Sequence, residues 1–265
     1  MTKESWVDMS LLKVTNLTKT FGGLTAVSEV DFEIKKNELV GLIGPNGAGK
    51  TTLFNLLTGV YQPTEGTIEF TTNEETHELG GKKTHHIGAL GVGRTFQNIR
   101  LFKNLSVLDN VLIGMHGEKK PSLFNLFLRT PKFYQLEDEM REEAMTLLEI
   151  FDLHKVHGNK AGNLAYGDQR KLEIVRALAT NPKLLFLDEP AAGMNASESR
   201  DLVRLINQIH ENYDIAIVLI EHDMNVIMNI TERIYVLEYG RKIAEGTPKE
   251  IQQNDRVIRA YLGGD

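Results

Sequence analysis

The chain has 265 residues, of which 41% are hydrophobic and 25% are charged, and it contains no cysteine. This composition is typical of a soluble globular protein with a large core, and the missing cysteines exclude disulfide bonds, thiolate zinc sites and cysteine nucleophiles. Because 36 acidic residues outnumber 30 basic ones and give a formal charge of −6, no binding to nucleic acids is expected.

Membrane insertion and export are not expected from the sequence. No apolar run approaches the roughly 18 residues that a membrane-spanning helix needs. The first ten residues include Lys3, Glu4 and Asp8 and lack the apolar segment of a signal peptide. We therefore expect a cytoplasmic protein.

Short apolar runs alternate with segments of helical period along the chain, a pattern that predicts an α/β fold. Continuous apolar runs of this length are typical of strands buried on both faces of a parallel sheet. The spacing of apolar residues in 197–212 predicts a helix with Ser197 as its N-cap, and Tyr239-Gly240 predicts a hairpin turn. The predicted strands are residues 11–14, 30–34, 39–43, 67–70, 184–188, 215–220 and 233–238.

The middle of the chain, residues 98–181, contains no clear strand and is interpreted as a helical insertion. Within it, residues 117–135 mix basic and aromatic side chains, which fits a locally packed loop or a contact with a membrane or partner. One apolar stripe at helical spacing predicts a buried helix face. The stripe consists of Met140, Ala144, Leu147, Leu148 and Phe151.

Residues 44–51 read GPNGAGKT and match the phosphate-loop pattern G-x-x-x-x-G-K-[ST]. The run follows a predicted strand and opens a helix that ends near Gly59, which is the context that the pattern requires. Its glycines let backbone N–H groups surround a phosphate, and the helix N-terminus adds positive partial charge. We expect the Lys50 ammonium to reach the β- and γ-phosphates and the Thr51 hydroxyl to bind Mg²⁺.

Two further apolar strands end in polar side chains: LLFLDE ends in Asp188 and Glu189, and IVLIEH ends in His222. Ligands of parallel sheets bind at the carboxyl ends of the strands, so Asp188 should face the same crevice as Lys50. There Asp188 can hold Mg²⁺, directly or through water, and Glu189 can take a proton from an attacking water. His222 can donate a hydrogen bond to a γ-phosphate oxygen.

These motifs occur in an order that resembles the ATP-binding subunits of ABC transporters, over residues 11–263. Several segments look like the LivG-type ATPase of branched-chain amino-acid importers in particular. The segments are RTFQNIRLF (94–102), NLAYG (163–167), LEI (172–174), DEPAAG (188–193) and VIRAYLG (257–263).

The resemblance implies a P-loop NTPase (RecA-like) core with an antiparallel β subdomain and a helical insertion, which is the ABC ATPase architecture. It implies a single domain over residues 10–263. Residues 10–97 and 182–263 would form the nucleotide-binding α/β core, and residues 98–181 the helical subdomain.

The resemblance also implies roles for individual residues. Phe21 would stack on adenine, Glu189 would be the general base, and His222 would be the γ-phosphate switch. Thr51 and Gln97 would ligate Mg²⁺ together with Asp188, and residues 191–195 match a loop that crosses between two subunits. The implied ATP-binding residues are Phe21, Ala26, Gly44, Pro45, Asn46, Gly47, Ala48, Gly49, Lys50, Thr51 and Thr52.

A capping segment, residues 164–169, would cover the ATP of a second ABC ATPase subunit, either a related chain or a second copy. Binding of two ATP molecules would close this dimer, and surfaces near 97–110 would pass the motion to two membrane permease subunits. An extracytoplasmic substrate-binding protein would deliver the cargo, with the ATPase on the cytoplasmic face of the inner membrane. The capping residues are Leu164, Ala165, Tyr166, Gly167, Asp168 and Gln169.

The capping segment departs from the commonest ABC signature, Leu-Ser-Gly-Gly-Gln. Ala165 replaces the serine, Tyr166 the first glycine, and Asp168 the glutamine; Asp168 also departs from the LivG-type pattern. The lost hydroxyl removes a hydrogen-bond donor to a charged phosphate, worth about 1.5–3 kcal/mol. We therefore expect the ATP site capped by this chain to be the weaker of an asymmetric pair.

Other functions are less compatible with the sequence. A soluble ABC protein acting on ribosomes or DNA is disfavoured by the single phosphate loop, the absence of heptads and the negative charge. A GTPase or small-molecule kinase is disfavoured because Asn159-Lys160 does not continue as Asn-Lys-x-Asp. A related cassette for urea remains an alternative, and the insertion disfavours a lipopolysaccharide exporter. The leading prediction is a Mg²⁺-dependent ATPase that energises a branched-chain amino-acid importer.

Overall fold

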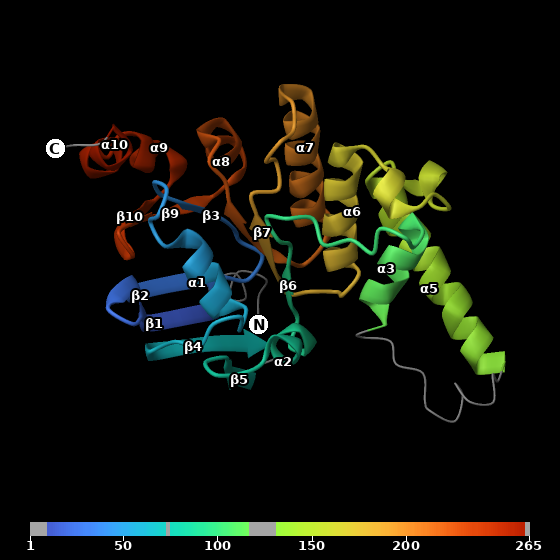
Figure 1. Ribbon diagram of the computed structural model, residues 1–265, viewed down its shortest axis with the longest axis horizontal. Coiled ribbons are helices and arrows are strands. Elements are labelled where there is room, and N and C mark those ends of the chain that lie inside the picture. The colour runs from blue at the N-terminus through green and yellow to red at the C-terminus, as the bar shows by residue number, and fades with distance from the viewer. Residues whose placement is uncertain (1–9, 73–74, 117–130, 263–265) are drawn as a thin grey trace, which may run out of the picture.

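The computed structural model describes residues 10–72, 75–116 and 131–262 (Figure 1). Most of the basic and aromatic stretch at 117–135 therefore lies outside the described residues. Within the described ranges, no helix has the length and apolar character needed to cross a bilayer.

The central element is a six-stranded sheet in the order β10-β9-β3-β8-β7-β6. Its strands pair in parallel except at the β9–β10 edge, which is antiparallel. Every residue of β3, β7 and β8 is buried, because helices and a second sheet cover the two faces. The strands are β3 (Leu39–Ile43), β6 (Val92–Arg94), β7 (Leu184–Asp188), β8 (Ala216–Ile220), β9 (Arg233–Glu238) and β10 (Arg241–Gly246).

Alternate residues of the central strands face two separate cores. Val218 and Phe186 join the core that contains α1 (Lys50–Leu57) and the second sheet. Leu219 and Leu187 join the core beneath α6 (Tyr166–Leu178), α7 (Ala196–Asn212) and α8 (Met224–Ile230). In Figure 1 α1 lies between the two sheets, and α6, α7 and α8 lie on the opposite side of the central sheet. This two-sided burial explains why the strand segments read as uninterrupted apolar runs.

The second sheet is antiparallel and four-stranded, in the order β2-β1-β4-β5. Its strands alternate between buried and exposed positions, as expected where one face packs on a core and the other faces solvent. The strands are β1 (Ser10–Phe21), β2 (Leu24–Lys35), β4 (Glu65–Thr72) and β5 (Glu75–Glu78).

The described residues between 98 and 181 form helices with a single isolated strand bridge, Ser106 to Lys160. The Ser106 side chain and Asp109 form a capping box that starts α3. The predicted stripe from Met140 to Phe151 is buried, on α5 and at the residue that directly follows it, which confirms that prediction. The division of the chain at 97 and 182 stays a prediction. The elements are α3 (Val107–Met115), α5 (Pro131–Ile150), α6 (Tyr166–Leu178), η2 (His154–Val156) and η3 (Ala161–Asn163).

The remaining helices flank the central sheet. The prediction of Ser197 as an N-cap is wrong: Asn195 caps α7, and its side chain accepts hydrogen bonds from the N–H groups of Ser197 and Glu198 at 2.9 and 3.0 Å. The hairpin at Tyr239-Gly240 is confirmed by the pairing of β9 with β10. These helices are α2 (Thr84–Ala89), α7 (Ala196–Asn212), α8 (Met224–Ile230), α9 (Pro248–Gln252) and α10 (Asp255–Leu262).

The seven predicted strands are all present, although β1 and β2 extend well beyond the predicted ranges and β8 begins one residue later. Several described elements were not predicted, because they are short or lack a clear apolar period: β5, β6, α2, α8, α9 and α10.

Candidate nucleotide-binding site

A cleft of about 470 Å³ opens where the phosphate loop, β7 and β8 come together at the carboxyl edge of the central sheet. It brings together most of the residues that the sequence predicted, although they come from distant parts of the chain. The lining residues are Leu24, Thr25, Ala26, Asn46, Gly47, Ala48, Gly49, Lys50, Thr51, Thr52, Gln97, Glu189, His222, Tyr239 and Gly240.

The phosphate loop requires glycine at its two ends for steric reasons. Gly44 and Gly49 have φ values of 154° and 98°, which side-chain-bearing residues rarely adopt. A Cβ atom at Gly44 would lie 2.2 Å from the carbonyl oxygen of Leu237, and one at Gly49 would lie 2.5 Å from that of Ala26. The loop is thus packed against the β9 strand and the end of β2, which fixes its curvature.

Helix α1 begins directly at the end of this loop. Its N-cap, Gly49, supplies no side-chain hydrogen bond, so the first N–H groups of the helix have no side-chain cap. Such a helix N-terminus attracts anions through its N–H groups and its dipole. The local structure therefore fits a phosphate group.

Lys50 is almost completely buried at the start of α1. Its Nζ atom donates hydrogen bonds to the carbonyl oxygens of Gly44 and Pro45, at 2.7 and 3.1 Å. Burial lowers the pKa of Lys50, and the nearby carboxylates of Glu189 and Asp188 oppose that change. The ammonium is therefore held at the loop, close to two negative side chains.

Three residues predicted for the site, Glu189, His222 and Gln97, are in contact through the Glu189 carboxylate. Its Oε1 atom lies 2.7 Å from Nε2 of His222, and its Oε2 atom accepts a 3.0 Å hydrogen bond from Nε2 of Gln97. The Glu189 side chain is 14% exposed and that of His222 is 45% exposed. A carboxylate held this way at the edge of a phosphate site can accept a proton from a water molecule.

The backbone of Glu189 is also unusual, because its φ of 48° lies in the left-handed region. This conformation is uncommon for a residue other than glycine and costs about 1–3 kcal/mol. The N–H of Glu189 donates a 2.9 Å hydrogen bond to the carbonyl oxygen of Ile220, which ties the residue to the end of β8. Strain of this kind is typical of functional sites.

Asp188 does not line the cleft. Its carboxylate accepts a 2.9 Å hydrogen bond from the guanidinium of Arg94, which also donates to side-chain oxygens of Asn55 and Thr58. Burial raises the pKa of Asp188, and the ion pair with Arg94 opposes that rise. The structure thus places Asp188 behind the cleft, paired with Arg94, rather than with its carboxylate on the cleft surface.

Phe21, Gly44 and Pro45 are likewise not among the lining residues. The Phe21 ring is 42% exposed and packs edge-to-face against Tyr61, with 5.2 Å between the ring centroids. Ala26 does line the cleft. The stacking of Phe21 on adenine stays a prediction.

Sequence reasoning missed several residues of the site, including Tyr239, Glu221 and Arg94. Tyr239 lines the cleft and is 86% exposed at the hairpin turn. Glu221 accepts a 2.7 Å hydrogen bond from the N–H of Ala191, and burial raises its pKa. Arg94 opens the RTFQNIRLF segment of the family resemblance, but no role was assigned to it from the sequence.

The capping segment lies at the start of α6, and none of its six residues lines the cleft described above. Ala165 is the N-cap and provides no side-chain hydrogen bond. Asp168 lies in the first turn and pairs with Lys171 at 3.5 Å, while Gln169 donates a 2.8 Å hydrogen bond to the carbonyl oxygen of Leu164.

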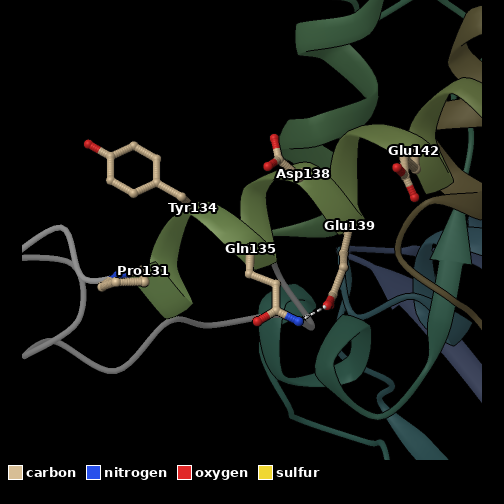
Figure 2. A pocket seen from close by; sticks show the side chains of 6 residues that line it. All are labelled: Pro131, Tyr134, Gln135, Asp138, Glu139 and Glu142. Carbon is tan, nitrogen blue, oxygen red and sulfur yellow. Dashed lines mark hydrogen bonds between the residues drawn. The ribbon is translucent and has the colours of Figure 1, made fainter.

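A second pocket, of about 670 Å³, lies on α5 and is lined by acidic side chains (Figure 2). Asp138, Glu139 and Glu142 come from one stretch of this helix, and Gln135 donates a 3.0 Å hydrogen bond to Glu139. Three carboxylates would repel a phosphate, so this pocket is not a second nucleotide site.

Comparison with known proteins agrees with this geometry. A family model for ABC transporters matches residues 27–192, and one for branched-chain amino acid ATP-binding cassette transporters matches residues 241–265. The chain is 49% identical to the high-affinity branched-chain amino acid transport ATP-binding protein LivG of Salmonella typhimurium, over 96% of this chain and 98% of the relative.

Solved structures of ABC cassettes are similar throughout the chain. The ADP conformation of MJ1267, an ATP-binding cassette of an ABC transporter, has a TM-score of 0.82 and 33% identity, covering 97% of this chain and all of that one. The dimeric bacterial cassette MJ0796 has a TM-score of 0.74 and 25% identity, covering 89% and 98% of the two chains. The chain therefore belongs to the family of ABC transporter ATP-binding cassettes, and within it to the LivG group.

Proposed function

We propose that this chain is the ATP-hydrolysing subunit of an importer for branched-chain amino acids. The observation that carries the proposal is the position of Glu189, held between Gln97 and His222 at the edge of a phosphate loop. The high identity to LivG, a branched-chain amino acid transport protein by name, supports the choice of cargo.

The cleft fits a nucleoside triphosphate with Mg²⁺. Within the described residues, no cluster of three or more His, Asp or Glu side chains could hold a metal alone. Magnesium usually takes few protein ligands and is held mainly by water and phosphate oxygens. The Thr51 hydroxyl and the amide oxygen of Gln97 would hold the ion, with Asp188 acting through water because Arg94 already binds its carboxylate. Bound there, Mg²⁺ would neutralise charge on the β- and γ-phosphate oxygens.

The protein's own residues then divide the work of hydrolysis. The Lys50 ammonium and the N–H groups of the loop bind the phosphates, and Glu189 takes a proton from the attacking water. His222 donates a hydrogen bond to the γ-phosphate, and Gln97 orients the Glu189 carboxylate. None of these roles requires a residue outside the cleft.

A second ATPase subunit completes the site. The capping segment does not line this chain's own cleft, and the similar cassette MJ0796 is dimeric. We infer that residues 164–169 cover the nucleotide of the opposing subunit, which is a related chain or a second copy. The loop at 191–195 would cross between the two.

A groove of about 1280 Å³ supports attachment to membrane permease subunits. It runs between α2 and β6 on one side and α3 and α6 on the other, next to the segment that carries Gln97. Arg100 and Arg176 line it beside Phe102 and Ile113, so it offers both charge and apolar surface. A permease segment seated there would place the protein on the cytoplasmic face of the inner membrane, with an extracytoplasmic binding protein serving the same transporter.

The test is uptake of labelled leucine and labelled urea by cells whose only copy of this chain carries Lys50→Ala. Lys155→Ala, at an exposed position on η2, is the matched control. Selective loss of leucine uptake is the expected result. Loss of urea uptake alone would overturn the cargo assignment, and unchanged uptake of both would overturn the importer assignment.

A further inference from the structure

Tyr166, in the capping segment, also contacts residues next to this chain's own site. It occupies the first turn of α6, where the commonest ABC signature has glycine, and it is 46% exposed. A single exposed aromatic residue needs no explanation by itself. Two contacts of this ring, with Gly193 and with Arg170, point to a functional role.

The first contact joins Tyr166 to the loop that follows Glu189. The ring lies against Gly193, so that a Cβ atom at position 193 would be 3.1 Å from Cε1 of the tyrosine. Gly193 has a φ of 78°, and any other residue there would combine backbone strain with a tight contact that displaces the tyrosine ring. The loop that leaves Glu189 therefore passes directly beneath the Tyr166 ring.

The second contact runs through Arg170, one helical turn further along α6. The Nε atom of Arg170 donates a 3.3 Å hydrogen bond to the Tyr166 hydroxyl, and the guanidinium carbon lies 5.6 Å from the ring centroid. The Arg170 side chain is only 3% exposed and pairs with Glu173 at 3.3 Å. The tyrosine thus covers a buried arginine on its solvent side.

The terminal nitrogens of Arg170 hold the segment that carries Gln97. Nη1 donates a 2.9 Å hydrogen bond to the carbonyl oxygen of Phe96, and Nη2 donates to that of Gln97. The Gln97 side chain in turn donates to the carboxylate of Glu189. A planar guanidinium with all three nitrogens engaged is rigid, so a displacement at one end of this chain of contacts reaches the other.

We propose that Tyr166 is a positioning residue for the Gln97–Glu189 pair of its own subunit. The inference rests on the proposed role of residues 164–169 in capping the partner's ATP. When the capping segment closes on that nucleotide, Tyr166 presses on Gly193 and, through Arg170, on the Gln97 backbone. Capping at one ATP site is thereby coupled to the geometry of the catalytic carboxylate at the other.

The test separates the two ATP sites in a mixed dimer purified through two different affinity tags and assembled with the permeases. One subunit carries the glutamate-to-glutamine change at its catalytic base, so that it binds ATP without hydrolysing it. The other subunit carries Tyr166→Phe and is the sole source of hydrolysis. The altered position 166 of this subunit faces the ATP of the partner, which is not hydrolysed. The ATP that is hydrolysed is capped by the unaltered segment of the partner.

We expect Tyr166→Phe to slow single-turnover hydrolysis in this mixed dimer about fivefold, the effect of losing one hydrogen bond of ordinary strength. The ATP concentration for half-maximal rate should stay unchanged. Tyr213→Phe is the matched control, because it removes the same hydroxyl from a tyrosine at the end of α7 that is 36% exposed and lies outside both the capping segment and the cleft. That control should leave the rate unchanged.

An additional variant tests the route through Arg170. Arg170→Lys keeps a charge for Glu173 but lacks the planar fork that bonds the Tyr166 hydroxyl and the two carbonyl groups at once, so adding Tyr166→Phe to it should produce no further loss. Thermal unfolding of each subunit checks that the fold is intact. An unchanged rate in the Tyr166→Phe mixed dimer would overturn the proposal, as would an equal fall for Tyr213→Phe. If the parent mixed dimer hydrolyses no ATP, the proposed function itself is wrong and the coupling with it.

Discussion

The guanidinium of Arg94 lies 2.9 Å from the carboxylate of Asp188, and the two side chains are only 8% and 3% exposed. Arg94 ends β6 and Asp188 ends β7, so this ion pair closes the edge of the sheet behind the nucleotide cleft. Arg94 also donates hydrogen bonds to the side chains of Asn55 and Thr58 and to the carbonyl oxygen of Thr95. A buried ion pair with such hydrogen bonding is tolerated, whereas removal of one partner leaves an uncompensated buried charge and destabilises the fold.

Arg94→Met should therefore lower the free energy of unfolding by about 3–5 kcal/mol, because it leaves the Asp188 carboxylate buried without a partner. Adding Asp188→Asn should recover a large part of that loss, since the amide carries no charge. Urea unfolding of the single and double variants measures both effects. If the double variant is less stable than Arg94→Met, the ion pair is not the source of the loss.

Glu189→Gln should leave nucleotide binding intact and reduce ATP hydrolysis by about 10²–10⁴, the usual contribution of a general base. The amide can still bond Gln97 and His222 but cannot take up a proton. Phosphate release and titration with a fluorescent nucleotide measure the two properties separately. Glu149→Gln, at an exposed position on α5, controls for the loss of one negative charge. Near-normal turnover in Glu189→Gln would falsify its role as base.

Ala165→Ser and Asp168→Gln together should raise the ATPase rate of the assembled transporter, because they restore a hydroxyl donor and remove a negative charge near the capped γ-phosphate. The two single changes should also alter the free energy of unfolding, in opposite directions. Serine at the N-cap of α6 should add about 0.5–2 kcal/mol. Loss of the first-turn charge and its pairing with Lys171 should cost about 0.3–1 kcal/mol.

Steady-state ATPase and urea unfolding of the two single variants and the double variant provide the measurements. An unchanged ATPase rate in the double variant would show that the two departures do not weaken the capped site. Equal stability of Ala165→Ser and the parent would show that the N-terminus of α6 needs no side-chain cap.

Glu221→Gln should gain stability relative to the parent as the pH rises from about 4 to 8. Burial raises the pKa of Glu221, and the charge of Glu189 acts in the same direction. The contribution of this carboxyl to stability is therefore complete below its ordinary pKa of 4.5 and is lost as the pH rises through the higher folded value. Glutamine keeps the hydrogen bond from Ala191 and does not titrate.

Urea unfolding across that pH range measures the difference between variant and parent. Glu211→Gln, at an exposed position on α7, corrects for the general effect of one charge fewer. A difference that does not change with pH would contradict the assignment of a raised pKa to Glu221.

The sequence predicted those parts of the site that depend on local spacing. The phosphate loop is recognisable because Gly44, Gly49 and Lys50 must follow one another at fixed intervals for steric and electrostatic reasons. Glu189 and His222 were found because each ends an apolar strand of a parallel sheet, and such ends converge. The N-cap of α7 could also have been predicted correctly, since Asn195 followed by Glu198 is a capping-box pattern.

Contacts between distant segments could not be predicted in this way. Arg94 and Asp188 are 94 positions apart, and Arg170 lies 73 positions from the Gln97 carbonyl that it bonds. Neither pair has a sequence pattern, because each depends on how α6 and β6 pack against the rest of the fold. Strand β6 is only three residues long and includes Gly93, so it lacks the apolar run that identified its neighbours.

The hydrogen bonds of Lys50 to the carbonyl groups of Gly44 and Pro45 bear on how fast the cleft can be emptied. Immobilising a free lysine side chain costs up to about 2 kcal/mol of conformational entropy, and here that loss occurs during folding, before any nucleotide arrives. An arriving phosphate then replaces two existing hydrogen bonds rather than ordering a mobile chain. Departure of the nucleotide is eased for the same reason, because the ammonium then regains its hydrogen bonds to the two carbonyl oxygens and is not left buried without a partner. A transporter that must discard its spent nucleotide in every cycle benefits from such a reversible exchange.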